Sequence, residues 1–252
     1  MGRWRLDLEY EGTGYAGWQL QPGQRTVQGD VEQSLASLLG EAVRVVPAGR
    51  TDSGVHAAHQ VVHVDTSCER TPHEMLGGIN HFLPDAIACW NAERVAEDFH
   101  ARHSKHSKTY RYRLMLRAAR SPLRRNRVWH VRQALRVAPM QEAASLLIGT
   151  HDFSAFRAAG CQATHPIRTL EDLRVRASGD EVHVEAHGTG FLRYMVRNLV
   201  GSLVEVGMGR QAPGWIAQVL ASADRTLAAR TAPASGLTLL RILYDGELDS
   251  ET

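Results

Sequence analysis

The chain has 252 residues, of which 43% are hydrophobic and 22% charged, so it is long enough to form more than one hydrophobic core. No apolar run approaches the roughly 20 residues that a membrane helix needs, and the first residues lack the apolar region of a signal peptide. Three cysteines, Cys68, Cys89 and Cys161, form no CxxC pair, which argues against a disulfide framework and a zinc–thiolate site. We therefore expect a cytoplasmic protein with no membrane partner.

The net charge of +2 conceals an uneven distribution of charge. Residues 99–141 contain twelve Lys and Arg and no Asp or Glu, so the rest of the chain is acidic. Aromatic residues lie inside this basic block, which suits a nucleic acid with exposed bases, although a solvated basic face is the alternative. Three of its arginines, Arg124, Arg125 and Arg127, follow a Ser-Pro loop signal and are expected to be exposed and to meet phosphates.

Hydrophobic periodicity predicts the elements of the first half of the chain. Apolar residues at positions 4, 6, 8 and 10 alternate with charged ones, which indicates a half-buried strand. Helical spacing from Val27 to Leu39 ends at Gly40, as a helix stop requires. Strands at 43–47 and 60–65, a helix at 72–82 and a strand at 86–95 follow. The predicted order is βαββαβ.

The same order is predicted to repeat in the second half. Its elements are a strand at 109–116, a helix at 139–148, a hairpin of strands 170–177 and 182–187, helices at 191–206 and 213–221, and a strand at 237–244. Two such repeats predict an α+β fold of two ferredoxin-like halves with antiparallel sheets, residues 1–105 and 106–252. One face of each sheet would then remain free to line a cleft.

Candidate chemistry lies in the octapeptide GRTDSGVH at residues 49–56. Its two glycines permit the sharp backbone path that exposes one side chain of a tight loop. Asp52 is the only carboxylate there and is ionised at neutral pH, so it can act as a nucleophile without an activating base. The alternative is an Asx-turn, in which Asp52 hydrogen-bonds its own backbone.

Two further motifs suggest other sites. Residues 12–17 match the dinucleotide fingerprint G-x-G-x-x-G, but the Pro-Gly at 22–23 is a loop signal where a helix must open. His56, His59 and His63 have ligand-like spacing, but along a strand His56 and His59 face opposite ways. We therefore expect neither a nucleotide cofactor nor a metal.

Six segments in chain order resemble the bacterial tRNA pseudouridine synthase A (TruA) family. GRTDSGVHA at 49–57 has Ser53 where the family usually has Ala. The others are YEGTGYAGWQ at 10–19, KTYRY at 108–112, HDFSAFR at 151–157, GFLRYMVRN at 190–198 and ASGL at 234–237. One departure, His103 in place of a common Phe after FHAR, leaves the local packing open.

The resemblance implies isomerisation of uridine to pseudouridine in tRNA, without a cofactor. Asp52 matches the family's nucleophile, Tyr110 the tyrosine that stacks on the flipped base, and Arg197 the arginine that pairs with the nucleophile. Arg50 is expected to guide the backbone of the target nucleotide. Arg193, one turn before Arg197 on the same helix face, is expected to contact a phosphate or lie on the surface.

The resemblance also implies two similar domains whose sheets meet, with the active site in a basic cleft between them. It further implies a homodimer in which one tRNA touches both subunits, and targets at positions 38, 39 and 40 of the anticodon stem-loop. Two other hypotheses stand beside it: a non-catalytic RNA-binding protein on the same fold, and a nucleotide-dependent oxidoreductase.

Overall fold

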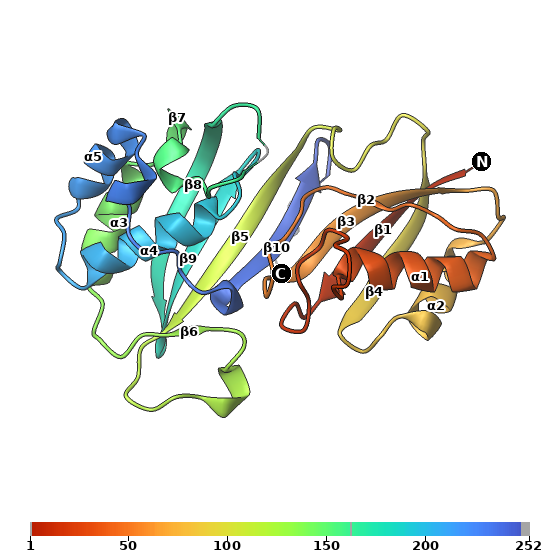
Figure 1. Ribbon diagram of the computed structural model, residues 1–252, viewed down its shortest axis with the longest axis horizontal. Coiled ribbons are helices and arrows are strands. Elements are labelled where there is room, and N and C mark those ends of the chain that lie inside the picture. The colour runs from red at the N-terminus through yellow and green to blue at the C-terminus, as the bar shows by residue number, and fades with distance from the viewer. Residues whose placement is uncertain (1, 162, 248–252) are drawn as a thin grey trace. The chain divides into compact units, whose positions relative to one another are not determined.

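The computed structural model describes residues 2–161 and 163–247 as a mixed α+β chain with mostly antiparallel strands (Figure 1). By its internal contacts the chain divides into two compact units, residues 1–106 with 239–252, and residues 107–238. The chain enters the second unit within one strand, β5, and leaves it within another, β10. Within the described residues, none of the helices has the length and apolar character required to cross a bilayer.

The first unit has the βαββαβ order predicted for it. Its elements are β1 (Gly2–Tyr10), α1 (Val27–Leu39), β2 (Val46–Pro47), β3 (His56–Thr66), α2 (Pro72–Phe82), β4 (Ile87–Val95) and most of β10 (Leu237–Tyr244). The strands lie in the order β4-β1-β3-β10, and β2 also pairs with β3. Strand β3 begins four residues earlier than periodicity predicts, because its first residues continue the antiparallel pairing with β1.

Helix ends in the first unit follow from local chemistry. The Thr26 side chain accepts from the Gly29 amide at the start of α1, and Gly40 ends the helix with a φ of 72°. At α2, Thr71 and Glu74 form a capping box ahead of a proline in the first turn. The two helices contact each other, and their apolar residues and those of β1, including Trp4, form the core.

The pairing of β1 with β3 fixes the place of two loops. Tyr10, the last residue of β1, lies opposite Ala57 near the start of β3. Strands that run antiparallel bring the end of one beside the beginning of the other. The loop that follows Tyr10 and the loop that precedes His56 therefore lie at the same end of the sheet.

The second unit contains the remaining elements. They are β5 (His106–Met115), β6 (Trp129–His130), α3 (Val137–Ser145), β7 (Gly149–Asp152), β8 (Ile167–Ser178), β9 (Glu181–Gly188), α4 (Met195–Gly207) and α5 (Trp215–Ser222). Strands β5, β9, β8 and β7 pair antiparallel in that order, and the short β6 pairs parallel with β5. The hairpin β8–β9 agrees with the prediction, whereas β6 and β7 were not predicted.

Helix α4 provides most of the helical core of this unit. Leu199, Val200 and Leu203 are fully buried, and α4 contacts α3, which in turn covers β8 (Figure 1). The predicted helix began at Phe191, but α4 begins at Met195. The reason is Tyr194, whose φ of 63° is left-handed and cannot continue a right-handed helix.

Candidate active site

Asp52 opens a tight turn between β2 and β3. The Val55 amide donates to the Asp52 carbonyl at 3.1 Å, and Gly54 has a φ of 77°. A positive φ at the third position of a four-residue turn is that of a type II turn, which favours glycine. Asp52 is thereby held at the start of the turn with its side chain partly exposed. Gly49 has no positive φ, so Gly54 alone makes the sharp path.

The loop after β1 lies directly against this turn. Gly17 and Asp52 form an isolated antiparallel bridge, and the Trp18 amide donates to the Thr51 carbonyl at 3.0 Å. Gly17 has a φ of 107°, and a Cβ on it would lie 2.8 Å from the Thr51 oxygen. The glycine is therefore required both by its backbone conformation and by the close approach of the two loops.

Gly12 makes a second close approach to the same turn. Its amide donates to Nδ1 of His56 at 3.1 Å, and a Cβ at this position would lie 2.0 Å from the Val55 oxygen. Helix α1 begins only at Val27, far beyond the last glycine of the G-x-G-x-x-G sequence. Gly12 and Gly17 support the Asp52 turn, and the sequence does not open a helix as a dinucleotide site requires.

Buried hydrogen bonds hold the turn from below. The Tyr10 hydroxyl and the Thr51 hydroxyl lie 2.8 Å apart, and Nε2 of Gln60 donates to the Gly49 carbonyl at 2.7 Å. Burial raises the pKa of Tyr10 to about 12, so its hydroxyl remains protonated and available as a donor at neutral pH. Rigid support of this kind reduces the movement of Asp52 relative to the sheet.

Positive charge gathers near the turn. Arg50 is exposed, and burial of part of its guanidinium, with the charges of Arg102 and Arg44 nearby, lowers its pKa. Arg44 lies 3.4 Å from Glu32, whose carboxylate offsets part of this charge. Like charges that remain close together favour an anionic ligand. Contact of Arg50 with a nucleic-acid backbone stays a prediction.

Tyr110 lies on β5 in the second unit, opposite Ala186 of β9. Its side chain is 8% exposed, and its ring meets that of Phe191 edge to face with centroids 5.1 Å apart. Phe191 belongs to the segment that leads into α4. Tyr110 is thus fixed in orientation by an aromatic neighbour from one of the six family-like segments.

Tyr194 lies between the two arginines that were predicted to share one helix face. That prediction was wrong for Arg193, which precedes the first residue of α4. Its ring lies 5.0 Å from the Arg193 guanidinium and 4.5 Å from that of Arg197. A non-glycine residue in the left-handed region is strained, and such strain is common at functional sites. Arg197 also donates its Nε–H to the Ala232 carbonyl at 2.8 Å. Arg193 is exposed, in agreement with a surface or phosphate-contacting role.

The predicted site residues fall into two groups. Asp52 and Arg50 share one turn in the first unit. Tyr110, Arg193 and Arg197 lie in the second unit. There Phe191 contacts the ring of Tyr110, and Tyr194 contacts both arginines. Residues distant in sequence support each group: Gly17 bridges to Asp52 in the first, and Phe191 contacts Tyr110 in the second.

Asn198 is a buried polar residue that the sequence reading did not single out. Its side chain is fully buried, donates to the Phe156 carbonyl at 2.8 Å and accepts from the Thr231 hydroxyl at 2.6 Å. The sequence offered one indication of this role, which is a polar residue within an apolar helical pattern. A buried amide of this kind is normally hydrogen-bonded.

The three histidines considered as metal ligands have separate partners. Nδ1 of His56 accepts from Gly12, Nδ1 of His63 accepts from the Ala101 amide at 3.0 Å, and His59 packs edge to face on Trp90. In the part of the chain that the structure describes, no group of three or more His, Cys, Asp or Glu is placed to hold a metal ion.

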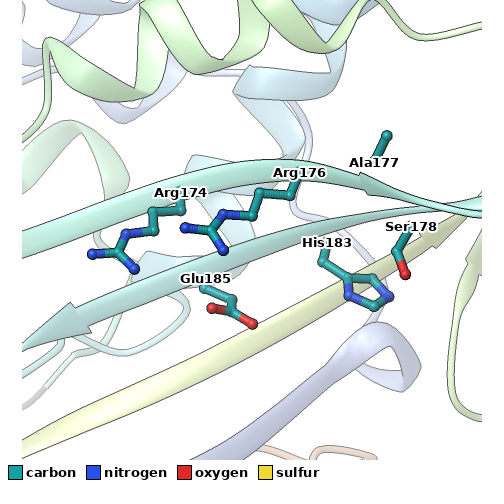
Figure 2. Close-up of a pocket in the computed structure, with 6 residues that line it drawn as sticks. All are labelled: Arg174, Arg176, Ala177, Ser178, His183 and Glu185. Carbon is teal, nitrogen blue, oxygen red and sulfur yellow. The ribbon is translucent and has the colours of Figure 1, made fainter.

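A shallow pocket lies on the hairpin β8–β9, away from the predicted residues of the second unit. Figure 2 shows Arg174 and Arg176 extending from β8, with His183 and Glu185 beside them on β9. Glu185 pairs with Arg111 at 2.7 Å, and His183 lies 3.0 Å from Glu181. The pocket is therefore a feature of an ion-paired sheet face and includes none of the predicted site residues.

Part of the basic block is neutralised within the second unit. Arg111 pairs with Glu185, Arg113 with Glu181, and Arg124 with both Asp180 and Glu181. The expectation that Arg124 is exposed and available to phosphates was wrong. Antiparallel pairing of β5 with β9 brings the turn that carries Asp180 and Glu181 beside this arginine. Arg125 and Arg127 are exposed as expected.

Comparisons with known proteins show which family the chain belongs to. The family model described as tRNA pseudouridine synthase matches residues 8–104 and 143–245. A protein of Myxococcus xanthus named tRNA pseudouridine synthase A is 49% identical over 245 residues, which cover 97% of this chain and 92% of the relative. Relatives with the same name from Bordetella petrii and Rhodospirillum rubrum are 47% and 46% identical, covering 98% of this chain and 93% and 89% of their own lengths. The chain belongs to the tRNA pseudouridine synthase family, and it is an isomerase of that type.

Proposed function

We propose that the chain converts uridine to pseudouridine in the anticodon stem-loop of tRNAs, at positions 38, 39 and 40, with Asp52 as the nucleophile. The observation that carries the proposal is the rigid turn that holds Asp52 beside exposed arginine. The N1–C1′ glycosidic bond breaks, the detached uracil turns within the active site, and C5 bonds to C1′. C5 loses its proton and N1 takes one up. The reaction is an isomerisation, so it requires no oxidant, reductant or added group.

Asp52 attacks either C1′ of the sugar or the uracil ring, and both routes need an ionised carboxylate held in one orientation. A paired uridine must first leave the helix stack, at a cost of a few kcal/mol. Arg50 contacts the backbone of the flipped nucleotide, where its charge is attracted to phosphate. The Gly12 and Gly17 contacts keep the turn in place while the base enters.

The second unit supplies the other side of the proposed site. Tyr110 stacks on the flipped base, and its hydroxyl takes part in proton transfer. Arg197 pairs with Asp52, which keeps the carboxylate charged and fixes its rotamer. Arg193 contacts a phosphate. Convergence of the two groups of residues in a basic cleft is part of this proposal, as are the homodimer and the cytoplasmic location.

The nucleophile is tested with Asp52→Asn, which is nearly isosteric but cannot form the covalent adduct. We expect pseudouridine formation to be lost while the Kd for tRNA stays within about twofold of wild type. Ser53→Ala is the matched control, because it changes the next residue of the same turn to the residue common in the family. It should keep wild-type turnover.

Pseudouridine is measured by sequencing tRNA after incubation with each variant. Turnover by a pure Asp52→Asn preparation would remove Asp52 as the nucleophile. Modification confined to positions outside 38–40 would instead leave the chemistry intact and change the substrate assignment.

A further inference from the structure

An irregular segment lies along α4 and is bonded to it at successive positions. We call this segment, residues 228–236, the strap. The Ala229 amide donates to the Ser202 hydroxyl at 3.3 Å, and the Arg230 carbonyl passes so close to α4 that a Cβ on Gly201 would lie 2.0 Å from it. Gly201 thus admits the backbone of the strap against the helix.

The strap meets Arg197 through two hydrogen bonds with one residue. The Ala232 amide donates to the Arg197 carbonyl at 3.1 Å, and Nε of Arg197 donates to the Ala232 carbonyl at 2.8 Å. Ala232 is fully buried. With its Nε–H committed to the strap, the Arg197 guanidinium can offer a carboxylate only its two terminal nitrogens, which is the end-on geometry for a bidentate pair.

Asn198 fixes the strap from the other side. Its Oδ1 accepts from the Thr231 hydroxyl at 2.6 Å and from Nη2 of Arg225 at 3.1 Å. The same Arg225 nitrogen also lies 3.1 Å from the Thr231 hydroxyl, which closes a three-membered network. Arg225 and Thr231 are half-buried, but Asn198 is fully buried, so its amide oxygen depends on these two donors in place of water.

Tyr112 provides a second attachment at the far end of the strap. Its hydroxyl donates to the Pro233 carbonyl at 2.7 Å. A Cβ on Gly236 would lie 2.5 Å from the Tyr112 ring, so the strap turns tightly against the strand that also carries Tyr110. Ala232 is therefore held between two anchors, Thr231 and Pro233.

We propose that the strap positions Arg197 for catalysis, with Asn198 and Thr231 as its positioning residues. The inference rests on the proposed function of Arg197 and assigns the part of the fold that sets its geometry. If the strap shifts, the Ala232 carbonyl shifts with it, and the guanidinium loses the bond that orients it. A displacement of about 1 Å at a catalytic group can reduce the rate by about 100-fold.

Thr231→Val tests the proposal, because valine keeps the shape of threonine and removes the hydroxyl. We expect kcat for pseudouridine formation to fall by about tenfold or more, with KM for tRNA within about twofold. Thr150→Val is the matched control. The Thr150 hydroxyl also bonds a neighbouring hydroxyl, that of Thr169 at 2.8 Å in the second unit, but contacts neither the strap nor Arg197. Its kcat should equal that of wild type.

Adding Thr231→Val to an Arg197→Lys enzyme shows whether the fall in kcat depends on Arg197. Arg197→Lys keeps the charge and removes the Nε–H group, so adding Thr231→Val to it should reduce kcat by less than about twofold. An equal reduction in both backgrounds would overturn the proposal. So would a Thr231→Val enzyme with a lowered melting temperature and unchanged kcat.

Hydrogen exchange gives a readout that needs no turnover. The Nε–H resonance of Arg197, assigned by its absence in Arg197→Lys, should exchange slowly in wild type and several-fold faster in Thr231→Val. Unchanged exchange would contradict the strap even in an active enzyme. If wild type made no pseudouridine, the proposed function would fail while this measurement still decided whether the strap holds the arginine.

Discussion

The glycines of residues 12–17 differ in what surrounds their α-carbons. Gly12 and Gly17 lie against the backbone of the Asp52 turn, and Gly17 also has a positive φ. Gly14 has no atom within 4 Å of the place where a Cβ would be. One glycine-rich sequence therefore contains two positions that require glycine and one that does not.

Alanine substitutions at these three glycines should therefore differ in their effect on stability and turnover. Gly12→Ala and Gly17→Ala should each lower the free energy of unfolding by about 2–4 kcal/mol and abolish most turnover, because backbone must move to admit the new methyl group. Gly14→Ala should be within about 0.5 kcal/mol of wild type. Urea unfolding and tRNA turnover on the three variants check this, and wild-type behaviour at Gly12 would show that the turn adapts.

Tyr110 allows the ring and the hydroxyl to be tested apart. Tyr110→Phe keeps the edge-to-face contact with Phe191 and any stacking on a base, so tRNA binding should persist while kcat falls. Tyr110→Ala removes both and should weaken binding as well, since base–aromatic stacking contributes about 1–3 kcal/mol. Equal, wild-type-like rates in the two variants would mean that Tyr110 has a structural role only.

At the scale of elements, the segment between β4 and β5 is held by histidines. The Ala101 amide donates to Nδ1 of His63, whose ring lies 4.6 Å from that of His100. His103, the departure from the family pattern, places its ring 4.3 Å from His100. Burial, followed by the charge of His100, lowers the pKa of His63 to about 4.

This arrangement predicts a loss of stability in mild acid. In the unfolded chain His63 takes up a proton near its ordinary pKa of about 6.5, whereas in the folded protein it remains neutral down to a pH of about 4. The unfolded state thus binds more protons within that window, and the free energy of unfolding falls as the pH is lowered through it. His63→Gln should reduce this dependence.

Urea unfolding from pH 7 to pH 4.5 measures the effect, with His73→Gln on the exposed side of α2 as the control. The control should keep the wild-type dependence. Equal dependence in wild type and His63→Gln would show that other groups carry the acid sensitivity of this segment.

Sequence periodicity predicted the long elements well and their ends less well. Helices α1 and α2 carry caps that are legible in the sequence, so their bounds agree with the prediction. Helix α4 starts late because of one residue, Tyr194, whose left-handed backbone no propensity indicates. The two-residue strand β6 depends on its pairing with β5 and has too few residues to show a period.

At the scale of the whole molecule, the sequence indicated the catalytic candidates but only some of the residues that support them. Asp52, Tyr110 and Arg197 lie in segments that resemble a family, whereas the strap has no motif of its own apart from its ASGL end. Asp7 illustrates the same limit. Alternation predicts it on an exposed face, yet it is 1% exposed, and Asn91 of the neighbouring strand β4 donates to its carboxylate across the sheet. Such contacts depend on register, which a single sequence does not give.

The basic block predicts how tRNA binding depends on salt. Each phosphate contact releases counterions and contributes about 0.7–0.9 to the slope of log K against log salt. Arg125 and Arg127 are exposed, whereas Arg124 is paired with Asp180 and Glu181. The double substitution of Arg125 and Arg127 by Gln should flatten the slope by roughly one to two units for all substrate tRNAs alike. The rate at saturating tRNA should change little, because these side chains do no chemistry.

Arg124→Gln provides the control, since it removes from the same loop one positive charge that is already paired within the protein. Burial alone would raise the pKa of Glu181, but hydrogen bonds from Arg113 and Arg124 outweigh it and lower that pKa to about 2. Loss of Arg124 therefore weakens a folded-state ion pair, so we expect reduced stability and an unchanged salt slope. Filter binding at about 50 to 200 mM salt distinguishes the two variants. A flattened slope in Arg124→Gln alone would show that tRNA displaces Asp180 and Glu181 from this arginine and that the phosphate path runs through it.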